Sequence, residues 1–144
     1  MMPEFVPYLF VYGTLREGFG NPYARRLARE GDFMAAAAFQ GRLYDVGHYP
    51  GVVASESASD QVFGDLFRLP EATGLWRWLD AYEGCSPTCA KPHEYVREVR
   101  TVRMHDETPV RAWVYLYNRN VRRLKRITSG DYRQWLRSAG GRSC

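Results

Sequence analysis

Six strand-like segments beside only three helix-like segments restrict how this chain can fold. The strand-like segments are apolar or alternate in polarity and cover residues 8–12, 40–45, 51–54, 61–69, 95–105 and 111–118. The helix-like segments cover 21–30, 71–83 and 129–138. The first begins at Asn21-Pro22, an N-cap residue followed by proline at the first helical position, and Ser129 offers a cap for the last. This ratio indicates a mixed α/β domain, and an aromatic content of 15% favours a curled sheet or small barrel over a flat doubly wound sheet. The alternation in 94–104 is imperfect, with Tyr95, Val99 and Thr101 on one face, so we expect a bulge there.

The length of 144 residues fits one domain, which we place at 8–138 between flexible ends at 1–7 and 139–144. The longest run of small apolar residues, 33–39, is too short to span a membrane, and residues 1–4 lack the basic start of a secretory signal. Three cysteines leave at least one unpaired, which fits a reducing compartment. We therefore expect a cytoplasmic protein.

An apolar strand runs directly into a glycine turn near the N-terminus. Residues 8–12 are aromatic or aliphatic, and Gly13 has no Cβ to keep a ligand away from the backbone. The amide groups of Gly13, Thr14 and Leu15 could point into one concavity, which would suit a carboxylate or an oxyanion. The alternative is an ordinary strand-to-loop turn, because short glycine turns are common.

Seven short blocks, spread over about Phe10 to Leu136, resemble the gamma-glutamyl cyclotransferase-like family and occur in that family's order. The blocks are Tyr12-Gly13-Thr14-Leu15; Gly41-Arg42-Leu43-Tyr44-Asp45 with Tyr49-Pro50-Gly51; Val62-Phe63-Gly64-Asp65-Leu66-Phe67; Leu79-Asp80-Ala81-Tyr82-Glu83-Gly84; Tyr95-Val96-Arg97; Ala112-Trp113-Val114-Tyr115; and Ser129-Gly130-Asp131-Tyr132. No single block is specific, but their common order is difficult to obtain by chance. The resemblance implies a small mixed β-barrel with flanking helices and a cavity at one end, rimmed by loops 13–20, 46–50 and 84–94.

The resemblance also implies a reaction. The α-amine of a gamma-glutamyl group attacks its own γ-amide carbonyl, which releases 5-oxoproline and an amine without a metal or cofactor. It further implies that Glu83 transfers the protons, that Tyr12, Gly13, Thr14 and Leu15 bind the small gamma-glutamyl substrate, and that the Tyr115 hydroxyl faces the cavity. Tyr115 could equally be a core aromatic, and Arg16 could reach a substrate carboxylate or be an exposed arginine without a role. Which amine leaves, and the oligomeric state, stay open.

The position of Glu83 also suits acid–base chemistry on physical grounds. Leu75, Trp78, Leu79 and Tyr82 have helical spacing and predict a buried stripe, which Glu83 extends before the capping residue Gly84. Burial and the negative end of the helix dipole both disfavour the anionic carboxylate, a property that suits a general base. The alternative is a surface residue at a fraying helix end. Other carboxylates nearby are Asp80 on the helix flank and Glu94 and Glu98, which could form ordinary pairs with Arg97 or Arg100.

Two other patterns have simpler explanations. Cys85, Cys89 and His93 have the spacing of zinc ligands, but Pro87 and Pro92 interrupt any helix there and a fourth ligand is missing, so we interpret the segment as an irregular loop. A net charge of +4 comes largely from Arg119, Arg122, Arg123, Lys125 and Arg126. This run lacks the interleaved aromatics that stack on bases, so we interpret it as a solvated loop rather than a nucleic-acid site. A non-catalytic binding module on the same fold is the main alternative to an enzyme.

Overall fold

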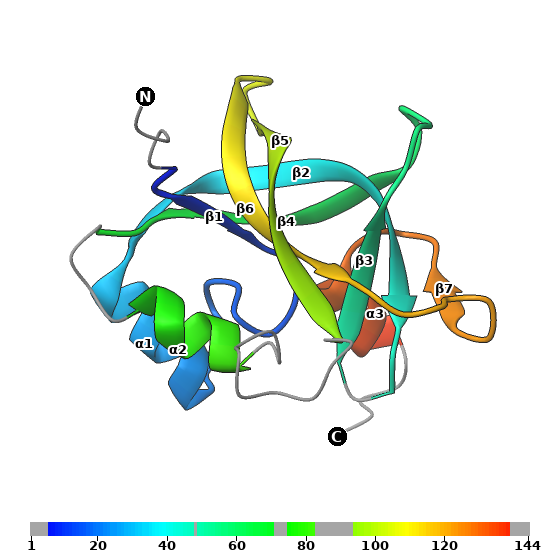
Figure 1. Cartoon of the computed structure of the whole chain (residues 1–144), viewed down its shortest axis with the longest axis horizontal. Coiled ribbons are helices and arrows are strands. Elements are labelled where there is room, and N and C mark those ends of the chain that lie inside the picture. The colour runs from blue at the N-terminus through cyan, green and yellow to red at the C-terminus, as the bar shows by residue number, and fades with distance from the viewer. Residues whose placement is uncertain (1–5, 48, 71–74, 83–93, 139–144) are drawn as a thin grey trace.

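Seven strands and three helices form the described part of the chain in this computed structural model, namely residues 6–47, 49–70, 75–82 and 94–138 (Figure 1). In chain order they are β1 (Tyr8–Val11), α1 (Pro22–Glu30), β2 (Asp32–Asp45), β3 (Pro50–Ala54), β4 (Gln61–Arg68), α2 (Leu75–Tyr82), β5 (Tyr95–Met104), β6 (Pro109–Tyr117), β7 (Lys125–Ile127) and α3 (Tyr132–Ser138). Each of the nine predicted segments contains an element of the predicted type. The short strand β7 is absent from the prediction.

The sheet closes into a barrel of five strands in the order β2-β4-β1-β6-β5. The closing contact is a short antiparallel pairing of β2 with β5, at Ala37 with Met104 and Ala38 with Arg103. β1 runs parallel to β6, whereas the other pairings between the described strands are antiparallel. β3 and β7 pair with the last part of β2 outside this ring. The prediction of a small mixed barrel is therefore confirmed.

β2 is much longer than the predicted strand at 40–45, because it begins at Asp32. The additional segment contains four consecutive alanines, which have little intrinsic preference for strands, but its long antiparallel pairing with β4 overrides this preference. The pairing register shifts between Phe33 and Ala35, so the irregularity lies in β2. Our prediction of a bulge in 94–104 is wrong, because β5 pairs with β6 in one unbroken register from Tyr95 to Arg103. Tyr95, Val99 and Thr101 lie on one face of this unbroken strand, as predicted, although Thr101 is exposed and Val102, on the other face, is buried.

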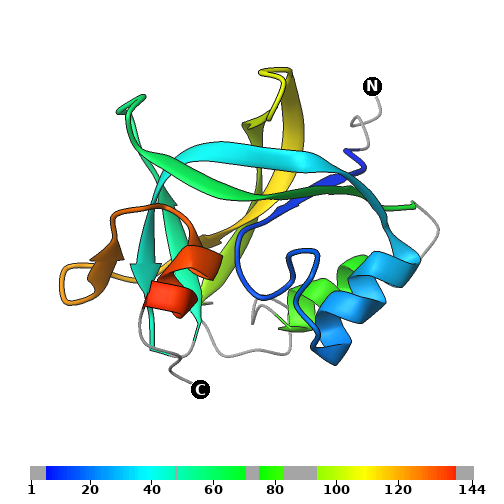
Figure 2. The ribbon, with the colours of Figure 1, turned by 180° about the vertical axis from the view of Figure 1, so that it is seen from behind.

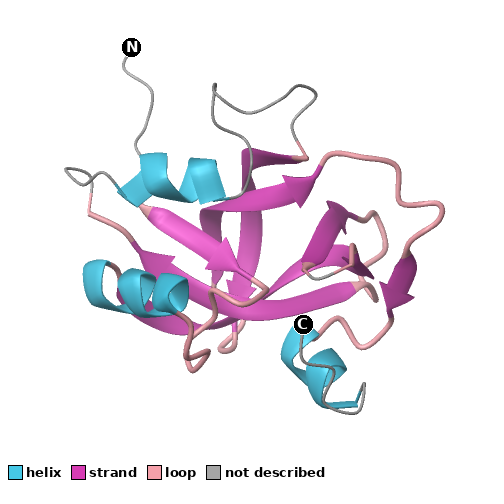
Figure 3. Ribbon diagram, turned by 90° about the horizontal axis from the view of Figure 1, so that it is seen from below, coloured by secondary structure: helices cyan, strands magenta, loops and turns pink. Residues whose placement is uncertain are grey.

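Two buried clusters lie on opposite faces of β1. Leu9 and Val11 pack in a cluster with Leu27 of α1 and Leu79 of α2, so this cluster is the layer between the barrel and these helices. Phe10, which alternates to the other face, packs in the second cluster, which α3 also joins. Figures 1 and 2 show α1 and α2 together on one side and α3 on the other, and in Figure 3 the helices lie at the periphery of the strands. The loop that follows β1 lies between these two groups of helices.

The helix starts follow local capping chemistry. Asn21 caps α1, since its side-chain oxygen accepts the Ala24 amide at 2.8 Å and Pro22 occupies the first turn, as predicted. The prediction that Ser129 caps the last helix is wrong. Asp131 takes this position, accepting the Gln134 amide at 3.1 Å, because Gly130 adopts a positive φ of 70° and turns the chain before the helix begins.

Candidate active site

A cavity of about 290 Å³ lies at the end of β1. All five predicted substrate-binding residues, Tyr12, Gly13, Thr14, Leu15 and Tyr115, are part of its wall. The structure therefore brings a turn from the start of the chain and a side chain of β6 together around one space. The wall also includes six residues without a predicted role in binding: Phe10, Val11, Tyr49, Pro50, Glu94 and Tyr95.

The turn that follows β1 is held on several sides. The Tyr12 hydroxyl donates to the Tyr115 carbonyl oxygen at 2.6 Å, and Leu15 is buried in the layer beneath α1 and α2. The Arg16 amide donates to the Gly13 carbonyl oxygen at 3.2 Å, and the Asn21 side chain donates to the Thr14 carbonyl oxygen at 2.8 Å. The same asparagine that caps α1 thus ties the turn to that helix, and the turn forms a stable part of the cavity wall.

Gly13 is required for a reason that the sequence does not reveal. A Cβ at this position would lie 2.9 Å from Pro50 Cγ and 3.3 Å from Pro50 Cδ. The missing side chain therefore leaves space for the proline ring at the start of β3. The expected orientation of the turn's amide groups toward a bound anion stays a prediction.

Arg16 is buried, with 7% of its surface exposed, so the expectation of an exposed arginine is wrong. Its guanidinium lies between two carboxylates, 3.1 Å from Asp131 Oδ1 and 3.8 Å from Asp65 Oδ1. Asp65 also accepts the Glu17 amide at 2.7 Å. Burial raises the pKa of Asp65, although this amide and Arg16 act in the opposite direction. These contacts fix the turn to β4 and α3, so Arg16 acts behind the cavity wall.

The Tyr115 hydroxyl makes a hydrogen bond to another side chain of the protein. It donates to Asp80 Oδ1 of α2 at 2.7 Å, and Tyr115 is only 2% exposed. The same oxygen accepts Arg97 Nε at 2.9 Å, while Arg97 Nη2 reaches Asp80 Oδ2 at 3.3 Å. Tyr115 is therefore both a cavity residue and a buried core aromatic. The contact connects β6 to the last turns of α2.

Arg97 does not pair with Glu94 or Glu98, as we had expected it could. Its guanidinium lies over two indole rings, 4.6 Å from the centroid of Trp76 and 4.3 Å from that of Trp113. These two cation–π contacts help to hold the arginine in position to bind Asp80. Glu98 instead contacts Arg100 at 2.6 Å, which is one of the pairings that we had expected to be possible.

Glu83 lies outside the described residues. The part of α2 that is described ends one residue earlier, and Leu79, one turn before Glu83, is fully buried, as the stripe predicts. Trp78 is half-buried and stacks on Tyr23 of α1, with ring centroids 5.9 Å apart. The helix that precedes Glu83 is therefore well anchored, while the role of Glu83 stays a prediction.

Residues 9–134 match the family described as "Gamma-glutamyl cyclotransferase, AIG2-like". The chain belongs to this family. A gamma-glutamylcyclotransferase family protein of Escherichia coli K12, YtfP, is 36% identical over 126 residues, which cover 86% of this chain and 94% of YtfP. The solution NMR structure of the Escherichia coli protein superposes with a TM-score of 0.60 over 87% of this chain and 95% of that chain, at 32% identity. A gamma-glutamylaminecyclotransferase of Bos taurus is 33% identical over 87 residues, covering 54% of this chain and 48% of the bovine protein.

This member of the AIG2-like family has cavity residues that the sequence reasoning did not assign to binding. The Tyr95 hydroxyl donates to the Pro50 carbonyl oxygen at 2.6 Å and joins β5 to β3, and Tyr49 and Glu94 form the adjacent part of the wall. The available signal was membership of Tyr49, Pro50 and Tyr95 in two family blocks. Glu94 precedes the Tyr95 block, so its signal was its place at the end of the expected rim loop 84–94, although we had interpreted it as a possible partner of Arg97 or Arg100.

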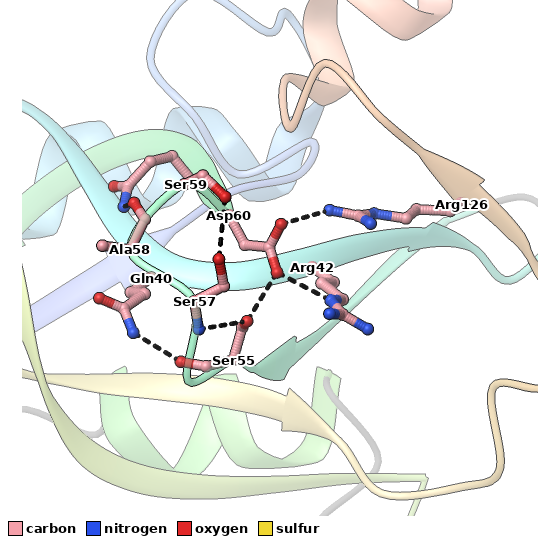
Figure 4. Close-up of polar contacts among 9 residues, drawn as sticks. Gln40, Arg42, Ser55, Ser57, Ala58, Ser59, Asp60 and Arg126 are labelled. Atoms are coloured by element: carbon pink, nitrogen blue, oxygen red, sulfur yellow. Dashed lines mark hydrogen bonds and ion pairs between the residues drawn. The ribbon is translucent and has the colours of Figure 1, made fainter.

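The basic run is partly neutralised by carboxylates. Arg126 Nη2 lies 2.7 Å from Asp60 Oδ1, while Arg42 Nε lies 2.8 Å from Asp60 Oδ2, so two arginines share one aspartate (Figure 4). Arg119 contacts Glu94 at 3.3 Å. The prediction of a solvated loop is wrong for its last residues, since Lys125 to Ile127 form β7 and pair with β2. These contacts favour a structural role for Arg126 over nucleic-acid binding.

No group of three or more metal-ligating side chains is found in the part of the chain that the structure describes. Cys85, Cys89 and His93, whose spacing resembles that of zinc ligands, lie outside that part. None of the helices within the described ranges is long and apolar enough to cross a membrane.

Proposed function

We propose that this protein is a gamma-glutamyl cyclotransferase that releases 5-oxoproline from a gamma-glutamyl amine or amino acid. The observation that carries the proposal is the cavity at the end of β1, whose wall contains the Tyr12–Leu15 block of the family together with Tyr115. The names of the relatives support the same chemistry, because they describe gamma-glutamylcyclotransferase family members and a gamma-glutamylaminecyclotransferase. Three cysteines, an odd number, support a reducing compartment such as the cytoplasm.

The reaction is an internal aminolysis. The α-nitrogen forms a bond to the γ-carbonyl carbon, the carbonyl oxygen becomes an oxyanion, and the bond from that carbon to the leaving nitrogen then breaks. Glu83 accepts a proton from the attacking nitrogen and returns a proton to the leaving nitrogen. Backbone amides of the Tyr12–Leu15 turn stabilise the glutamyl group or the oxyanion. This assignment requires no cofactor, since both proton transfers use the same carboxylate.

The cavity suits this reaction in size and stiffness. About 290 Å³ is near the lower end for small-molecule sites, which fits a compact glutamyl group. The tyrosine contacts of the wall hold the turn and β6 in fixed positions, so the site can favour the curled conformation in which the α-nitrogen approaches the γ-carbonyl.

The test measures 5-oxoproline release from gamma-glutamyl amino acids, gamma-glutamylamines and gamma-glutamyl-lysine. We expect release by the wild type and a loss of about 100- to 10,000-fold in Glu83→Gln, equivalent to roughly 3 to 5 kcal/mol of transition-state stabilisation. Glu98→Gln is the matched control, because this exposed carboxylate contacts Arg100 and is not part of the cavity wall.

Two outcomes would contradict the proposal in different ways. Full activity in Glu83→Gln would refute the role of Glu83 but keep the reaction. No release from any substrate by folded wild-type protein would refute the reaction. Binding of the same compounds without turnover would then favour a non-catalytic binding module on this fold.

A further inference from the structure

Glu94 is the charged residue among the described residues that line the cavity. It lies immediately before β5, and 24% of its side chain is exposed, so the carboxylate is partly shielded from water. The other described lining residues are aromatic, aliphatic or uncharged polar residues, or glycine and proline. A single negative charge in such a wall attracts a cation more strongly than it would on an open surface.

Among the described residues, the hydrogen-bond partners of Glu94 contact one of its two carboxylate oxygens. Tyr49 donates its hydroxyl to Glu94 Oε2 at 2.8 Å, and Arg119 Nη1 donates to the same oxygen at 3.3 Å. Oε1 accepts no hydrogen bond from any described residue. Burial, followed by the hydrogen bond to Glu94, raises the pKa of Tyr49 to about 12, so the tyrosine stays a donor at neutral pH. The hydrogen bonds to Oε2 thus orient the Glu94 carboxylate, and Oε1 can accept a hydrogen bond from a further donor.

Two aromatic rings line the same cavity as this carboxylate. Tyr49 and Tyr95 both line the cavity, with ring centroids 6.3 Å apart and an interplanar angle of 54°. Aromatic faces attract ammonium groups through their quadrupoles, and a nearby carboxylate adds a direct ion pair. Arg119 competes for this carboxylate only in part, because half of the arginine side chain is exposed to water.

We propose that Glu94, with Tyr49 and Tyr95, binds a positive charge on the leaving amine and so determines which gamma-glutamyl substrates are preferred. The inference rests on the proposed cyclotransferase function and specifies its substrate class. A leaving amine with a second, distal ammonium group fits this wall, whereas one with a distal carboxylate meets a like charge.

Three substrates with the same chain length test the proposal. Each carries the gamma-glutamyl group on a five-carbon amine: pentylamine, 1,5-diaminopentane or 5-aminopentanoate. For the wild type we expect kcat/KM to be about two- to fivefold higher for the diamine than for pentylamine, the range of a partly exposed ion pair, and lowest for the aminopentanoate. In Glu94→Gln the ratio of kcat/KM between the diamine and pentylamine conjugates should fall to about one.

Two further variants make the result specific. Arg119→Gln should increase the preference for the diamine, because a competing cation is removed from Glu94. Glu98→Gln should behave as the wild type in all three reactions.

An equal decrease for all three substrates in Glu94→Gln would overturn the proposal, because it would mean that Glu94 binds the α-ammonium group common to them all. Equal kcat/KM for the diamine and pentylamine conjugates in the wild type would also overturn it. If no substrate is turned over, the cyclotransferase function fails, and calorimetric binding of the same conjugates tests Glu94 separately. Tighter binding of the diamine conjugate that disappears in Glu94→Gln would support the subsite, and equal binding would overturn it.

Discussion

Tyr115→Phe should destabilise the protein by about 1 to 2 kcal/mol. The ring stays in place, so the substitution creates no cavity and removes the hydrogen bond from the hydroxyl to Asp80 Oδ1 at 2.7 Å. A hydrogen bond to a charged acceptor contributes about 1.5 to 3 kcal/mol. The lower part of this range applies, because Arg97 still binds Asp80 and a quarter of the Asp80 side chain is exposed to water.

The measurement is urea unfolding of the wild type, Tyr115→Phe, Asp80→Asn and the double variant at pH 7. If the hydroxyl and carboxylate interact as the structure indicates, the two single changes should not be additive, and the coupling should be about 0.5 kcal/mol or more. Tyr117→Phe is the matched control on the same strand. The Tyr117 hydroxyl makes no hydrogen bond to a described residue, and the Tyr117 ring packs on Tyr95. We expect it to change stability by less than about 0.5 kcal/mol.

The reasoning would be refuted if Tyr115→Phe and Tyr117→Phe had equal effects, or if the double variant were additive. Either result would mean that the contact between β6 and α2 contributes no net stability. The connection that we infer between the cavity wall and the helix preceding Glu83 would then have no energetic basis.

Three further changes test other parts of the structure. Gly13→Ala should cost about 1 to 3 kcal/mol in urea unfolding, because the new methyl group would lie 2.9 Å from Pro50 Cγ; wild-type stability would show that the proline ring moves freely. Burial raises the pKa of Asp65 above its usual 3.8. The stability of the wild type relative to Asp65→Asn should therefore be greatest below that pH, and it should fall as pH rises through the folded-state pKa. Unfolding curves at a series of pH values check the sign of this dependence. Hydrogen bonds from Ser55, and then from Arg42 and Arg126, lower the pKa of Asp60. Asp60→Asn should therefore be less stable than the wild type at pH 7, and this difference in stability should shrink in acid. A difference that stays constant with pH would contradict the role of these hydrogen bonds.

The elements with strong local signals were predictable. Asn21 followed by Pro22 specifies the start of α1, because the capping bond and the fixed φ of proline involve only neighbouring residues. The ordered blocks also predicted the family, the mixed barrel and the position of the Tyr12–Leu15 turn beside a cavity. These features depend on residue types over short stretches of the chain.

The sequence was less informative about which side chains contact each other in the fold. Nothing near Arg16 indicates that Asp65 and Asp131 surround it, and nothing near Arg97 indicates two indole rings and Asp80. In both cases most of the partners are distant in the chain. The prediction missed the alanine-rich start of β2 for the same reason, because the strand conformation of this segment comes from its pairing with β4.

The sequence by itself determined the local elements, the turn after β1 and membership of the AIG2-like gamma-glutamyl cyclotransferase family. Tertiary structure decided the closure of the barrel at Ala37 and Ala38, the burial of Arg16 and the placement of Glu94 in the cavity wall. The physical reason is that capping and turn formation are set by adjacent residues. Burial, ion pairing and strand order depend on which distant segments the closed sheet brings into contact.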